Sequence, residues 1–151
     1  MKPTDGWSGY NGVRDLSADA VIQTGGWHPR YARVLLIEHN DHDGLVLVDG
    51  NGDGAELELE YWHRGDDGLW RCGATAGHGP LAFPPTFQAW NAGDFVAAVG
   101  RARPGAKIEI EYGGQRYRRH ANEFGIWGFV HVADSPDSSE LPTMVGRPPV
   151  V

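Results

Sequence analysis

The chain of 151 residues is long enough for one domain, or for two very small ones that share a core. Its 22 glycines and 10 prolines favour many short strands and turns over helices. The formal net charge of −7 argues against a nucleic-acid-binding surface and supports either solubility or a basic partner.

Other features of the composition bear on the compartment. No apolar run approaches the roughly 20 residues of a membrane-spanning helix, so we expect no membrane association. The first residues lack the basic start and apolar stretch of a signal peptide, which predicts a cytoplasmic protein. Cys72 is the single cysteine and excludes an internal disulfide. Arginine is frequent whereas lysine occurs only at positions 2 and 107, as is typical of GC-rich bacterial codon usage.

Residues 1–30 are polar and glycine-rich, and we interpret them as a strap over the core. Their isolated aromatic residues are expected to pack rather than to bind a ligand. These are Trp7, Tyr10 and Trp27. Ser17 can cap a short helix through Gln23, but residues 20–24 fit a strand equally well.

Residues 31–76 predict a four-stranded antiparallel meander. The runs 33–38 (RVLLIE) and 45–48 (LVLV) are continuously apolar, as in strands covered on both faces. Residues 55–64 and 69–74 supply the other two strands, and short polar turns separate all four.

The third of these strands has the clearest pattern in the chain. Apolar and acidic residues alternate from position 56 to position 61, which predicts a half-buried strand. The residues of the apolar face are Leu57, Leu59 and Tyr61, and those of the acidic face are Glu56, Glu58 and Glu60.

Residues 73–85 (GATAGHGPLAFPP) are predicted to be an irregular connector between sheets. Their glycines are compatible with a phosphate-binding loop, but no Gly-Lys-Ser/Thr follows them. Three prolines also argue against a helix in this segment.

Beyond the connector the sequence again predicts strands, at 95–99, 107–112, 115–120 and 124–132, and a short edge strand at 143–146. The Gly-Gly pair at 113–114 can take the positive φ angles of a two-residue hairpin. This turn fixes which residues face each other across the hairpin. The expected pairs are Ile110 with Tyr117, Glu111 with Arg116, and Glu109 with Arg118.

Residues 100–132 (GRARPGAKIEIEYGGQRYRRHANEFGIWGFVHV) combine a Pro-Gly-Ala turn, an alternating strand, a Gly-Gly hairpin and an aromatic-rich strand. This succession resembles the bacterial immunoglobulin-like sandwich domains, over roughly the last third of the chain. The resemblance implies a fold for residues 86–148 and no activity. The whole is predicted to be a single two-lobed, all-β domain of about nine or ten strands, either a two-sheet sandwich or a partly closed barrel.

The turn after residue 48 matches the calcium-loop pattern D-x-N-x-D-G-x5-E. The matching residues are Asp49, Asn51, Asp53, Gly54 and Glu60. Because the chain after Gly54 alternates as a strand, Glu60 would lie about 20 Å further along, too far to close the site. We therefore favour a hairpin turn with solvated carboxylates, and keep an incomplete calcium site at Asp49, Asn51 and Asp53 as an alternative.

A second candidate metal site lies at the end of the meander. If Val48 pairs with Ala55, His63 becomes a neighbour of Asn40 in the turn between the first two strands. Histidine and carboxylate side chains there would suit zinc or another transition metal, although histidines at strand ends are commonly just solvated. The candidate ligands are His39, Asp41, His42, Asp43 and His63.

Nucleophilic catalysis has little support in the sequence. Cys72 lies on the apolar face of its strand, where a buried thiol is inert, and no Gly-x-Ser-x-Gly motif is present. His131 alternates with Trp127 and Phe129 and is expected to be a hydrogen-bonded histidine at the edge of the core.

We therefore predict a small acidic protein-binding module without chemistry or cofactor of its own, which contacts its partner through loops. The predicted contact loops are 40–44, 65–68, 73–85 and 133–142. One alternative is a metal-binding protein or metal-dependent enzyme that uses His39, His42 and His63. Another is an immunity or antitoxin-type inhibitor, which small size and acidity favour.

Overall fold

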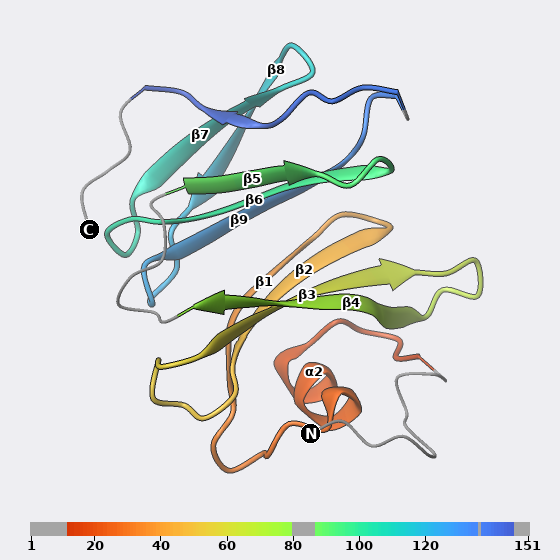
Figure 1. Ribbon diagram of the computed structural model, residues 1–151, viewed down its shortest axis with the longest axis vertical. Helices are drawn as coiled ribbons and strands as arrows, with labels where there is room; N and C mark the ends of the chain where they lie inside the picture. Colours follow the sequence, from red (N-terminus) through yellow and green to blue (C-terminus); the bar gives the residue numbers. More distant parts are fainter. Residues whose placement is uncertain (1–11, 80–86, 136, 147–151) are drawn as a thin grey trace. The chain divides into compact units, whose positions relative to one another are not determined.

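The computed structural model describes residues 12–79, 87–135 and 137–146. The chain divides into two compact units, Met1–Phe83 and Pro84–Val151. The predicted all-β class is confirmed: the described residues form ten strands in three antiparallel sheets, together with the helix α2 (Figure 1). None of these sheets closes on itself within the described ranges. In the same ranges no helix is long and apolar enough to cross a membrane.

The first unit contains the predicted meander as one sheet with the strand order β1-β2-β3-β4. Its strands are β1 (Arg33–His39), β2 (Asp43–Asp49), β3 (Leu57–Arg64) and β4 (Trp70–Gly79). Strand β2 is buried along its whole length, as its apolar run predicts. The prediction of an irregular connector is wrong for residues 73–79, because β4 continues to Gly79. The rest of that connector, residues 80–85, falls outside the described residues.

The register between β2 and β3 differs from the predicted one. Asp49 pairs with Leu57 and Asp43 with His63, so the loop that joins the two strands is longer than a turn from Val48 to Ala55. The side chain of Asp49 is the reason. Its carboxylate accepts hydrogen bonds from the backbone N–H groups of Gly52 and Gly54, at 3.0 and 2.8 Å, and this fixes a wide loop.

The helical alternative near the N-terminus is confirmed. Helix α2 (Ala18–Gly25) begins after Ser17, whose hydroxyl accepts a hydrogen bond from the N–H of Ala20, and it ends at Gly26 with a positive φ of 71°. The helix packs on one face of the sheet (Figure 1), and its Val21 lies in the core of this unit. The other buried members of this core are Val46, Val48, Trp62 and Trp70. Trp7 and Tyr10, the other aromatic residues of the predicted strap, fall outside the described residues.

The second unit has two three-stranded sheets that share one core. One sheet has the order β5-β6-β9, formed by β5 (Phe87–Asn91), β6 (Phe95–Arg101) and β9 (Ile126–Val132). The other has the order β10-β7-β8, formed by β10 (Thr143–Met144), β7 (Lys107–Tyr112) and β8 (Gln115–His120). Strand β5 was not predicted from the sequence.

The predicted register of the β7–β8 hairpin is confirmed residue by residue. Ile110 faces Tyr117, Glu111 faces Arg116, and Glu109 faces Arg118. Gly113 and Gly114 have φ angles of 61° and 76°, as a two-residue hairpin requires. The acidic and basic side chains form ion pairs across the hairpin, the shortest of which is 3.4 Å between Arg116 and Glu111.

Candidate functional site

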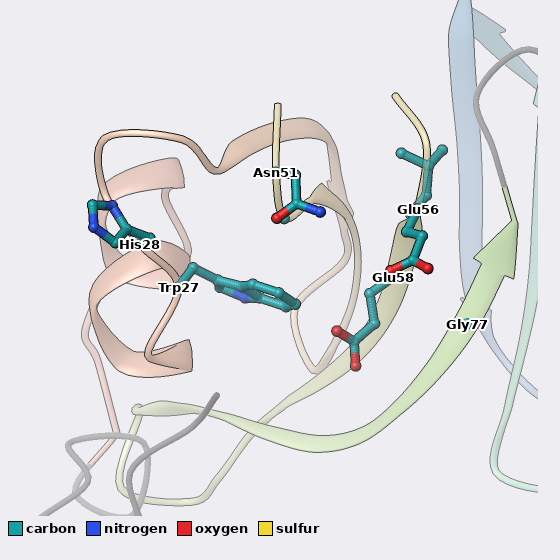
Figure 2. Close-up of a pocket in the computed structure, with 8 residues that line it drawn as sticks. Trp27, His28, Asn51, Glu56, Glu58 and Gly77 are labelled. Carbon is teal, nitrogen blue, oxygen red and sulfur yellow. The ribbon is translucent and has the colours of Figure 1, made fainter. Parts of the chain in front are cut away.

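A pocket of about 550 Å³ opens in the first unit, between the segment that follows α2 and the start of β3. Trp27 and Asn51 line it on one side, and Glu56 and Glu58 line the other (Figure 2). The remaining lining residues are His28, Gly50, Leu57 and Gly77. Aromatic, amide and carboxylate groups thus surround one space.

Two glycines approach the indole of Trp27 closely. A Cβ atom added to Gly25, in the last turn of α2, would lie 2.7 Å from the five-membered ring of Trp27. A Cβ atom added to Gly50 would lie 2.8 Å from its six-membered ring. Any larger residue at position 25 or 50 would therefore displace the indole, so both glycines are needed for its present position.

The orientation of the Trp27 ring is also fixed by a buried carboxylate. The indole N–H of Trp27 donates to Oε2 of Glu60 at 3.2 Å, and the indole N–H of Trp62 donates to Oε1 at 3.0 Å. Glu60 is fully buried, with 0 % of its surface exposed. The predicted acidic face of this strand was expected to face solvent. That prediction is wrong at Glu60, which points into the core beside Trp62.

The two carboxylates at the pocket mouth have no cationic partner among the described residues. Glu56 is exposed and Glu58 is half-buried, and neither forms an ion pair with an arginine, lysine or histidine of those ranges. They stand two residues apart along the chain where β3 begins, and Glu58 extends toward the Trp27 ring (Figure 2). The pocket therefore carries negative charge that the described part of this chain does not neutralise.

The residues of the calcium-loop pattern have separate structural roles. Asp49 is fully buried and holds the β2–β3 loop through Gly52 and Gly54, with Arg33 at 3.4 Å from its carboxylate, so its predicted solvation is wrong. Asp53 accepts a hydrogen bond from the N–H of Ala55 at 2.9 Å. Of the remaining members, Asn51 lines the pocket and Glu60 lies in the core. The chain beyond Gly54 continues into a strand, as expected.

The candidate zinc ligands do not gather at one point in the described structure. His39 shares the sheet face of Trp62 and packs edge-on against Trp70, with ring centroids 5.3 Å apart. His63 projects from the opposite face, next to Asp43. The described residues include no group of three or more histidine, cysteine or acidic side chains that could hold a metal ion.

Asp43 and His63 are the two candidate ligands that the fold does bring together. Nδ1 of His63 lies 3.6 Å from Oδ1 of Asp43, and the hydroxyl of Tyr61 donates to that same oxygen at 2.7 Å. His42 and Asp41 are exposed in the turn, which Asn40 stabilises by accepting N–H bonds from His42 and Asp43. The sequence pattern did not single out Tyr61 as a partner of this pair.

The remaining residues considered for chemistry contact other groups of the described structure. Cys72 is partly buried against the core of the first unit. His131 contacts the hydroxyl of Tyr117 through Nε2 at 3.2 Å and the carbonyl of Val132 through Nδ1 at 2.8 Å, so both ring nitrogens are engaged.

Comparison of the chain with protein-family models, with curated proteins and with solved structures finds no match. The resemblance of residues 100–132 to immunoglobulin-like sandwich domains therefore stays a prediction.

Proposed function

We propose that this protein is a non-catalytic binding module whose pocket in the first unit accepts a basic side chain of a partner protein. The observation that carries the proposal is the combination of the Trp27 ring with the carboxylates of Glu56 and Glu58, which form no ion pair with any residue that the structure describes. An indole face attracts a cation electrostatically, and nearby carboxylates add charge and hydrogen-bond acceptors. The net charge of −7 would steer a basic partner toward the protein from a distance.

The pocket also has the rigidity that binding requires. Trp27 is fixed by Glu60 and by the close approach of Gly25 and Gly50, so little side-chain freedom is lost when a ligand arrives. This distinguishes Trp27 from an aromatic side chain that is merely exposed.

Fluorescence anisotropy with labelled peptides of equal length, one basic and one acidic, tests this proposal. We expect the basic peptide to bind, with an affinity that falls as salt screens the charges. The double variant Glu56→Gln/Glu58→Gln should weaken this binding. The control variant Asp66→Asn/Glu123→Gln changes the net charge equally at exposed sites outside the pocket and should retain it. Equal binding by the two double variants would contradict the proposal.

An immunity or antitoxin-type inhibitor is one special case of this proposal, because the acidic pocket and overall charge would suit a basic target. The metal-dependent alternative has less support. The described structure brings the pair Asp43 and His63 together, but it contains no group of three or more possible ligands.

A further inference from the structure

The arrangement of groups in the Trp27 pocket discriminates between kinds of cation. Asn51, Glu56 and Glu58 provide several hydrogen-bond acceptors on the sides of the pocket. Trp27 provides the one large aromatic ring among the described residues that line the pocket. A single ring is a platform, whereas recognition of a quaternary ammonium, which has no N–H donors, uses a cage of several rings. The pocket therefore suits a flat cation that can stack and donate at the same time.

Guanidinium has these two properties. It is planar, stacks on aromatic faces, and carries a rigid fork of N–H donors that matches carboxylate oxygens. An ammonium group is a compact point charge that does not stack and holds its water more strongly. On the same pocket, a guanidinium therefore gains from the ring and from the acceptors, while an ammonium gains mainly from the charge.

We propose that the pocket is a guanidinium site, in which an arginine side chain of the partner stacks on Trp27 and donates hydrogen bonds to Glu56 and Glu58. This inference rests on the proposed function, because it names the kind of basic side chain that the module selects. Gly50 and Glu60 act as positioning residues, since they fix the ring on which the guanidinium stacks.

The test is isothermal titration calorimetry with three peptides that differ at one central position, occupied by arginine, lysine or citrulline. Citrulline keeps the planar shape of arginine but lacks its charge. We expect arginine to bind about tenfold more tightly than lysine, a difference of about 1.4 kcal/mol, and citrulline to bind more weakly still. The Glu56→Gln/Glu58→Gln variant should weaken binding of the arginine peptide about tenfold or more.

Gly50→Ala tests whether the ligand stacks on Trp27, and it does so without removing any charge from the pocket. The added methyl group would displace the Trp27 ring, so the preference for arginine over lysine should shrink because arginine loses more affinity than lysine does. A Trp27→Leu variant, which removes the ring, should have the same effect and serves if Gly50→Ala does not fold. Amide NMR spectra check the fold of each variant.

The outcomes separate the two proposals. If arginine and lysine bind equally and both are lost in the Glu56→Gln/Glu58→Gln variant, the guanidinium inference is overturned and the binding module stands. If that variant binds every peptide as the wild type does, the proposed function itself fails. If the arginine preference survives in both Gly50→Ala and Trp27→Leu, stacking on Trp27 is refuted.

Discussion

Replacing Glu60 with glutamine should destabilise the first unit by about 2–4 kcal/mol. Both carboxylate oxygens of Glu60 accept an indole N–H, from Trp62 at 3.0 Å and from Trp27 at 3.2 Å. The two indoles donate to different oxygens of Glu60, and a glutamine side chain has an oxygen at one of these positions and an NH2 group at the other. The other indole N–H would then face a donor.

The magnitude follows from opposing contributions. A hydrogen bond to a charged group contributes about 1.5–3 kcal/mol, and a buried donor left without an acceptor costs about 1–3 kcal/mol. The amide is easier to bury than the carboxylate, which offsets part of this loss. Because Trp62 is fully buried and Trp27 is only partly buried, we expect the amide oxygen to turn to Trp62 and to release Trp27.

Urea unfolding followed by tryptophan fluorescence measures the free energy of unfolding. Glu58→Gln is the matched control, since it makes the same change two residues earlier on β3, at a side chain without a hydrogen bond to a described residue. We expect the control to lie within about 0.5 kcal/mol of the wild type. In a Trp27→Phe background, Glu60→Gln should cost less, because phenylalanine has no N–H to leave unsatisfied. Equal stability of Glu60→Gln and Glu58→Gln, or a gain in Glu60→Gln, would refute this reasoning.

Three further predictions concern the surface. Glu111→Arg places a like charge opposite Arg116 and should lower the free energy of unfolding by about 0.2–1 kcal/mol, more than the same change at an exposed glutamate outside a sheet. The hydrogen bond from Arg71 lowers the pKa of Asp67 to about 2, so the pair stabilises the protein fully above the ordinary aspartate pKa and loses this effect as the pH falls through about 2. Carboxyl NMR titration should show that Arg71→Gln raises this pKa. We expect that adding zinc does not change the melting temperature of the wild type or of His63→Ala. A zinc-dependent rise in the wild type that His63→Ala abolishes would establish a metal site.

The two hairpins show where the local sequence was sufficient to predict the strand register and where it was not. The register of β7 and β8 follows from Gly113 and Gly114, because a two-residue turn leaves one way to pair the strands. The register of β2 and β3 depends instead on the carboxylate of Asp49, which widens the loop by binding backbone N–H groups. Nothing in the turn composition distinguishes this aspartate from a solvated one.

The candidate site could not be predicted from the sequence for a related reason. Alternation correctly predicts that Glu60 lies on the face opposite Leu59, but it assigns that face to solvent because carboxylates are rarely buried. What buries Glu60 is a pair of indole donors, one of them 33 residues away at Trp27. The position of Trp27 depends in turn on where α2 ends and on how closely Gly50 approaches it, and both are properties of the tertiary structure.

The contacts around the Trp27 ring have an evolutionary consequence. A bulkier residue at position 25 or 50 is compatible with the present position of the side chain at 27 only if that side chain is smaller than tryptophan, and the indole at 27 needs an acceptor at 60. Substitutions at positions 25, 27 and 50 should therefore be inherited together rather than singly. Homologous sequences that keep the tryptophan should keep both glycines and the glutamate. Those that lose it should be released from the constraint at both glycines but should keep the glutamate, which still accepts the indole N–H of Trp62.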